Sequence, residues 1–199
     1  MAELTIPVSD RDHVRGVETA PATLVIYGDY ECPYTRLAYR AVQRVLADEP
    51  EYLRFVFRHF PLSRIHPHAQ QASEAAEAAA AQGTFWEMHD MLFAHQHALE
   101  DTDLARYAQE LGLDVERFAR ELGANAYAGR IQEDHTQWAR QRRAGDAYAL
   151  LQRPVACWRL RRCGATGDHR PDSARCLKSI LGRASRTLRQ ESWHHLESA

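Results

Sequence analysis

The chain has 199 residues, of which 25 are lysine or arginine and 27 are aspartate or glutamate, giving a formal net charge of −2 at pH 7. This length suits one domain, or one domain with a sizeable insertion. The charge balance excludes a global electrostatic case for binding nucleic acid or an anionic membrane. No secretory signal is visible at the start, and no run approaches the roughly 18 apolar residues of a membrane span. We therefore expect a cytoplasmic protein without a membrane partner.

The first predicted unit, in residues 1–62, is β-α-β. Ala22 to Tyr27 is an apolar, β-branched run that indicates a buried strand. From Pro33 to Leu46 the apolar residues recur at helical spacing, and from Leu53 to Phe60 they alternate as in a second strand. A crossover helix of this length is what parallel strands require, so we predict that the two strands pair in parallel.

Residues 63–140 predict an all-helical segment inserted into this α/β domain. Most of its helices are marked by a capping residue at the start or a glycine at the end. The first predicted helix runs from His66 to near Gly83, and a second begins at Thr84, with Glu87 as its partner in a capping box. The next two run from Leu104 to Leu111, capped by Asp101, and from Val115 to Leu122, capped by Asp114. The last runs from Ala124 to Arg140.

The remaining residues, 141–199, follow neither a strand period nor a helix period. They contain many arginines and three of the four cysteines of the chain. We therefore predict an irregular, poorly ordered C-terminal tail. A zinc site in this tail is a weak alternative, because its potential ligands lack any Cys-x-x-Cys knuckle; they are Cys157, Cys163, His169 and Cys176.

The motif Cys32-Pro33-Tyr34-Thr35 lies where the first predicted strand passes into the helix. A free thiol has a pKa of about 8.5, and a helix N-terminus can lower it to roughly 3.5–7.5 by stabilising the thiolate. Pro33 suits the first helical position, where its missing N–H costs nothing. We expect Cys32 to be the catalytic nucleophile, with Thr35 as a hydroxyl donor to the thiolate. A buried structural cysteine is the alternative.

Several further segments, together with this motif, carry a resemblance to a known family. They are Tyr27-Gly28-Asp29-Tyr30-Glu31-Cys32-Pro33-Tyr34, Arg54-Phe55-Val56-Phe57-Arg58-His59-Phe60-Pro61-Leu62, His66-Pro67-His68-Ala69, Ala75-Ala76-Glu77-Ala78-Ala79 and Gly83-Thr84-Phe85-Trp86-Glu87-Met88-His89. Over roughly the first 140 residues the chain resembles the DsbA-like branch of the thioredoxin superfamily. The lead-in Asp12-His13-Val14-Arg15-Gly16 is similar to that of thioredoxin-like domains found alone or appended to sodium/proton antiporters.

The chain departs from this family at two places. Thr35 stands where the family has the second cysteine of Cys-Pro-Tyr-Cys. The family also has a Gly-Thr-Pro-Thr loop whose proline is cis and lies against the active-site cysteine. Here only Pro154 and Pro171 follow the helical segment, and neither has that context.

A shift of reading frame accounts for the missing loop. If each codon from Gln141 is read from its second base, Asp146, Ala147 and Tyr148 permit Thr-Pro-Thr. We therefore hypothesise that the chain from about residue 141 is an out-of-frame version of a DsbA-like C-terminal half. A diverged C-terminal extension is the alternative, and the nucleotide sequence around these codons decides between them.

The resemblance implies a thioredoxin-like fold and an enzyme that exchanges thiols and disulfides with proteins or small molecules. Because Thr35 cannot resolve a mixed disulfide, we expect a monothiol mechanism without a bound cofactor, in which an external thiol such as glutathione resolves the intermediate. A redox-inactive thioredoxin-like scaffold or binding module is the alternative function. We assign no metal ligands, and substrate, redox direction and oligomeric state are not readable from the sequence.

The histidines of the helical segment are given structural roles. His66 and His68 are compatible with a metal pair, but we favour a capping or surface role at the start of the alanine-rich helix. His89, His95 and His97 are expected on the polar face of the helix that begins near Phe85, or just beyond it.

Overall fold

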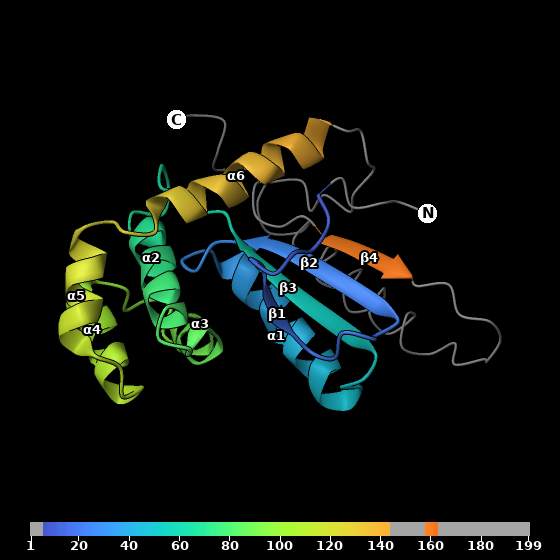
Figure 1. The fold of residues 1–199 in the computed structure, drawn as a ribbon, viewed down its shortest axis with the longest axis horizontal. Coiled ribbons are helices and arrows are strands. Elements are labelled where there is room, and N and C mark those ends of the chain that lie inside the picture. The colour runs from blue at the N-terminus through green and yellow to red at the C-terminus, as the bar shows by residue number, and fades with distance from the viewer. Residues whose placement is uncertain (1–5, 144–157, 163–199) are drawn as a thin grey trace, which may run out of the picture.

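The computed structural model describes residues 6–143 and 158–162, which form an α/β fold with a small mixed sheet (Figure 1). The elements in chain order are β1 (His13–Arg15), β2 (Ala22–Gly28), α1 (Pro33–Asp48), β3 (Leu53–His59), α2 (Ala69–Ala80), α3 (Phe85–Ala94), α4 (Asp101–Glu110), α5 (Val115–Gly123), α6 (Ala128–Arg143) and β4 (Trp158–Arg162).

The predicted β-α-β unit is confirmed. Strands β2 and β3 pair in parallel, from Ala22 opposite Leu53 to Gly28 opposite His59, and α1 connects them. Two further strands complete the sheet in the order β1-β3-β2-β4, and both pair antiparallel with their neighbours. The sequence analysis predicted neither of them. β1 has only three residues, too few to show an alternating pattern.

The two faces of the sheet bury different side chains because successive residues of a strand point in opposite directions. Leu24 and Ile26 face the main core, which also holds apolar side chains of α1 to α5. Val25 and Tyr27 face a smaller cluster, against which Trp138 of α6 packs. The loop between β2 and α1, which carries the Cys32 motif, therefore follows a strand buried on both faces.

The helical segment is confirmed, with corrections at several ends. The alanine-rich helix begins at Ala69 rather than at His66, and the last helix begins at Ala128 rather than Ala124. Asp114 caps α5 as predicted, since its carboxylate accepts a hydrogen bond from the N–H of Arg117 at 2.9 Å. Gly112, which follows α4, has the positive φ of 70° that favours glycine.

Two predicted helix caps are wrong. Thr84 precedes α3 but makes no cap hydrogen bond, because its hydroxyl donates instead to the carbonyl of Ala79 at 3.2 Å. Asp101 is the first residue of α4 rather than its cap, and the capping position belongs to Glu100. Both helices are thus held by packing in the core rather than by side-chain caps.

The C-terminal end of the described chain contains more regular structure than predicted. Helix α6 continues to Arg143, and β4, which lies within the region predicted to be irregular, pairs antiparallel with β2. The hypothetical out-of-frame loop and the tail cysteines lie outside the described residues, so the frameshift hypothesis stays a prediction. Within residues 6–143 and 158–162, no helix is both long and apolar enough to cross a bilayer.

Candidate active site around Cys32

Cys32 lies at the N-terminus of α1, where the sequence analysis predicted it. It is the capping residue of the helix, with an extended backbone, and Pro33 follows in the first turn. The loop that leads to it is tightly packed: a Cβ on Gly28 would lie 2.4 Å from the ring of Phe57 and 2.8 Å from the methyl group of Thr35. As long as the Thr35 side chain lies where it does, only glycine therefore fits at position 28, at the end of β2.

The buried carboxylate of Asp29 determines the shape of this loop. It accepts hydrogen bonds from the backbone N–H groups of Glu31, Cys32 and Leu62, at 2.8, 3.2 and 2.8 Å. The imidazole of His66 also lies 2.8 Å from it, through Nδ1. We call these five residues the Asp29 cluster. It connects the Cys32 loop to the segment that follows β3.

A second carboxylate–histidine pair lies beside the Asp29 cluster. Glu31 accepts hydrogen bonds from the backbone N–H of His68 at 2.8 Å and from its Nδ1 at 3.1 Å. The predicted roles of His66 and His68, capping or surface, therefore need correction. His68 occupies the capping position of α2 without a side-chain cap, and both imidazoles bind carboxylates of the Cys32 loop.

A buried glutamine holds the loop from the other side. The Gln96 side-chain amide donates to the backbone carbonyls of Tyr30 and Cys32, both at 2.7 Å. The sequence analysis gave no role to Asp29, Glu31 or Gln96. One signal was available for the first two: two carboxylates two positions apart, at 29 and 31, match two histidines two positions apart, at 66 and 68.

The electrostatic environment of the Cys32 thiol differs from our expectation of a depressed pKa. The side chain of Cys32 is only 1 % exposed. Burial raises the pKa of the thiol, and the backbone N–H groups of Thr35 and Tyr34 lower it only in part. The negative charge of Asp29 raises it further, so the net pKa of Cys32 is higher than its ordinary value.

Thr35 takes the place of a resolving cysteine and is fully buried. Its hydroxyl accepts a hydrogen bond from the N–H of Asp29 at 3.4 Å. It also interacts with Cys32, where a hydrogen bond lowers the pKa of the thiol. The role of Thr35 as a hydrogen-bond donor to the Cys32 thiolate stays a prediction. A hydroxyl still cannot form a disulfide.

Tyr30 and His89 form a buried pair behind the Cys32 loop. The phenol oxygen of Tyr30 lies 2.8 Å from Nδ1 of His89. We predicted His89 on a polar face, which is wrong, because it is fully buried; His95 and His97 are exposed, as expected. Burial, together with the positive charge of Arg15, lowers the pKa of His89 well below its ordinary value, so the imidazole is neutral.

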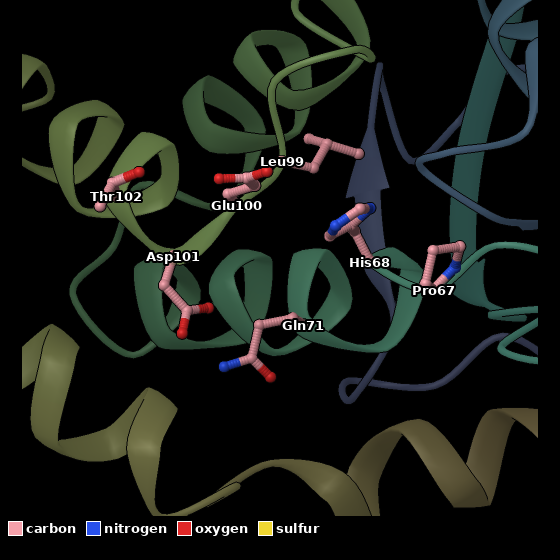
Figure 2. A pocket seen from close by; sticks show the side chains of 7 residues that line it. All are labelled: Pro67, His68, Gln71, Leu99, Glu100, Asp101 and Thr102. Atoms are coloured by element: carbon pink, nitrogen blue, oxygen red, sulfur yellow. The ribbon is translucent and has the colours of Figure 1, made fainter.

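A pocket of about 430 Å³ opens next to this site, between the start of α2 and the start of α4. Figure 2 shows His68 between helix α2 and the segment that carries Leu99 and Glu100. His68 connects the pocket to the Cys32 loop through Glu31. The side chains that line the pocket are mostly polar; they are Pro67, His68, Gln71, Leu99, Glu100, Asp101 and Thr102.

The fold and this site define a class of protein. The sequence model of the thioredoxin family matches residues 9–143, which is more than half of the chain. The chain therefore belongs to the thioredoxin family. The fold is that of its DsbA-like members: the chain superposes on a thioredoxin-like oxidoreductase from Silicibacter pomeroyi with a TM-score of 0.63 at 24 % identity, covering 89 % of this chain and 94 % of that one.

Other relatives extend this comparison. The chain superposes on BdbD from Bacillus subtilis with a TM-score of 0.65 at 17 % identity, covering 93 % of this chain and 98 % of BdbD. In sequence it is 54 % identical over 133 residues, or 66 % of its length, to the sodium/proton antiporter NhaA 3 of Salinispora tropica. The chain matches about a fifth of the length of that antiporter, 20 %. The expected similarity to domains of antiporters is thus confirmed.

Proposed function

We propose that the chain is a thiol–disulfide oxidoreductase that uses Cys32 as a monothiol nucleophile. One observation carries the proposal: in a member of the thioredoxin family, Cys32 begins α1 with the N–H groups of Tyr34 and Thr35 close enough to stabilise its thiolate. The DsbA-like fold supports the same activity. The substrates we propose are disulfides of proteins or small molecules.

The reaction has two steps. The Cys32 thiolate attacks one sulfur of a substrate disulfide, the substrate S–S bond breaks, and its other sulfur leaves as a thiolate that takes up a proton. An external thiolate, for which we propose glutathione in a reducing cytoplasm, then attacks the substrate sulfur of the mixed disulfide. A disulfide between substrate and glutathione forms, and Cys32 leaves as a thiolate. Thr35 remains a hydrogen-bond donor throughout, and no bound cofactor takes part in either step.

The burial of Cys32 favours a second candidate function. A thiol that is 1 % exposed and has a raised pKa reacts slowly, which is the behaviour of a redox-inactive scaffold or binding module. For the oxidoreductase, substrate binding has to uncover the sulfur. The two functions therefore differ in whether Cys32 forms a mixed disulfide at all.

The experiment that separates them is incubation of the reduced full-length chain with oxidised glutathione, followed by peptide mass spectrometry. The oxidoreductase predicts a glutathione adduct on Cys32 that reduced glutathione removes. Cys32→Ser is the control for adducts on the other cysteines. A short reference peptide with a single cysteine is added to the same sample. If this peptide forms the glutathione adduct and Cys32 does not, the oxidoreductase function is excluded and the scaffold function remains.

Restoring the second cysteine provides a further test. Thr35 is buried within the reach of Cys32, and cysteine differs from threonine mainly by exchanging the hydroxyl and methyl groups for a thiol. Thr35→Cys should therefore convert the mixed disulfide into an internal one and release glutathione. Thr35→Ser is the matched control, because it keeps the hydroxyl and cannot resolve the adduct.

A further inference from the structure

A carboxylate and two imidazoles converge at a place separate from the Asp29 cluster. The side chains belong to His13 of β1, His59 of β3 and Glu77 of α2, and we call them the Glu77 cluster. The Oε1 atom of Glu77 lies 2.8 Å from Nε2 of His13 and 2.8 Å from Nε2 of His59. All three atoms lie within 4.8 Å of one another.

From this geometry we propose that the Glu77 cluster binds a zinc ion, or a similar divalent transition metal. Two imidazole nitrogens and one carboxylate oxygen are ligands that zinc accepts, with Zn–N and Zn–O distances of about 2.0–2.2 Å. Two nitrogen ligands make magnesium and calcium poor occupants, since these ions take oxygen ligands. Among the residues that the structure describes, this group has three protein ligands, so a water molecule would take the fourth position.

Small movements bring the three atoms to bonding distance. Ligands on a tetrahedral zinc ion with bonds of about 2.0 Å lie roughly 3.3 Å apart. The two pairs that are now at 2.8 Å have to open by a few tenths of an ångström, and the two imidazoles have to approach from within 4.8 Å. His13 and His59 lose only the hydrogen bonds to Glu77 that the metal replaces.

The surroundings of the cluster favour a cation. Glu77 is only 6 % exposed, and a buried carboxylate needs a positive partner. The His13 ring also stacks on Phe85, with centroids 3.4 Å apart, which orients its Nε2 atom.

The three ligands come from three different elements, and this suggests what the metal does. β1 is the short edge strand, and it pairs with β3 over three residues. A metal between His13, His59 and Glu77 would tie this strand to α2 as well as to β3. Metal binding should therefore stabilise the folded chain.

The test is a titration of the reduced full-length chain with cobalt(II), whose visible absorption depends on the kind of ligands that bind it. Zinc is then added to displace the cobalt. We expect one cobalt ion per chain with nitrogen and oxygen ligands, a site that Cys32→Ser retains. In His13→Gln, the affinity for cobalt should fall by more than about 100-fold, beyond the roughly 10- to 100-fold loss caused by changing a group that only hydrogen-bonds to a ligand. The matched control is His95→Gln, which changes an exposed histidine of the same chain.

Thermal unfolding gives a second readout. Zinc should raise the melting temperature of the wild-type chain and leave that of His13→Gln unchanged. Because His13 is at a partly exposed edge, this variant should fold even where Glu77→Gln does not. The proposal is overturned if His13→Gln binds cobalt as tightly as the wild type, or if the spectrum shows thiolate ligands, which would assign the metal to the cysteines.

Discussion

Asp29 and Glu77 are both buried carboxylates that bind histidine, but their other partners differ. Asp29 accepts three hydrogen bonds from backbone N–H groups and one from His66. Glu77 binds two imidazoles through a single oxygen. Backbone donors neither titrate nor leave, so the Asp29 cluster shapes a loop. Two imidazoles that share one carboxylate oxygen are a set of metal ligands, so the Glu77 cluster is the one for which we propose zinc binding.

The largest expected effect comes from breaking the Asp29 cluster. Asp29→Ala leaves the N–H groups of Glu31 and Leu62 and the imidazole of His66 without their acceptor, and each orphaned group costs about 1 kcal/mol or more. The N–H of Cys32 keeps the backbone carbonyl of residue 29 as an acceptor, at 3.2 Å. We therefore expect the free energy of unfolding to fall by about 3 kcal/mol or more, measured by urea denaturation. Asp10→Ala removes an exposed carboxylate and should change it by less than about 0.5 kcal/mol. Equal losses in the two variants would contradict the role of Asp29.

The next largest effect is on stability in acid and involves the neutral His89. Its pKa is lowered by burial in the folded state and is about 6.5 in the unfolded state. Below pH 6.5 the imidazole of His89 therefore binds a proton in the unfolded chain but not in the folded one. As the pH is lowered, the free energy of unfolding decreases by up to about 1.4 kcal/mol per pH unit. At pH 5 this amounts to about 2 kcal/mol relative to pH 8.

The matched variants test this linkage. His89→Phe loses the hydrogen bond to Tyr30 at every pH, so its stability is lower throughout, but its loss between pH 8 and pH 5 should be smaller than that of the wild type. His97→Gln changes an exposed histidine and should follow the wild-type curve. Chemical denaturation across this range provides the measurement. Parallel curves for wild type and His89→Phe would show that His89 is not the titrating group.

Gln96 tests whether losing a donor to backbone carbonyls lowers the free energy of unfolding as much as losing the acceptor that Asp29 provides for backbone N–H groups. Gln96→Ala removes the amide donor to the carbonyls of Tyr30 and Cys32, both buried in this region. We expect a loss of about 1–2 kcal/mol in the free energy of unfolding, less than in Asp29→Ala, because carbonyls tolerate a missing partner better than N–H groups do. Gln109→Ala, at an exposed position, is the control and should have almost no effect.

The next prediction concerns the reactivity of the Cys32 thiol, which depends on its pKa. Burial and the charge of Asp29 raise the pKa of the thiol, so less thiolate is present at neutral pH than in a free cysteine. The rate of alkylation by iodoacetamide, followed on the Cys32 peptide, should therefore reach half of its maximum at a pH above about 8.5, which is the midpoint for a free cysteine. Asp29→Asn should speed the reaction at pH 7. A midpoint pH for Cys32 equal to or below that of a free cysteine measured in parallel would contradict the raised pKa.

The elements that the sequence predicted well depend on local patterns. The alternation of Leu53 to Phe57 and the placement of Pro33 after Cys32 are enough to locate β3 and the start of α1. Thr84 and Glu87 also form a local pattern, but the structure uses the Thr84 hydroxyl for the carbonyl of Ala79. A local signal therefore shows which residues can cap a helix, and tertiary packing decides which of them do.

The site was predictable only in part, for the same reason. Cys32 and Thr35 were recognised because their spacing is local. Asp29 and His66 are 37 positions apart, and no period in the sequence relates them. The direction of the pKa shift of Cys32 depends on burial, which is the sum of contacts from distant elements. Helix position alone predicted a depressed pKa, because it omits the larger cost of desolvation.

The smallest expected effect concerns substrate preference at the pocket beside His68. The described residues of its lining include the carboxylates of Glu100 and Asp101 and no lysine or arginine, so the pocket should favour disulfides next to basic residues. Each exposed charge contributes about 0.2–1 kcal/mol, which corresponds to a rate change of roughly 1.4- to 5-fold. Glu100→Lys with Asp101→Lys should therefore shift the ratio of rates for basic and acidic peptide disulfides towards the acidic peptide.

A control of equal charge separates this local effect from net charge. Glu87→Lys with Glu116→Lys makes the same change at exposed positions outside the pocket lining and should leave the ratio near its wild-type value. In about 1 M salt, where charges are screened within roughly 3 Å, the difference between the two double variants should disappear. If both double variants shift the ratio equally, substrates are steered by the whole molecule, and the pocket beside His68 does not select them.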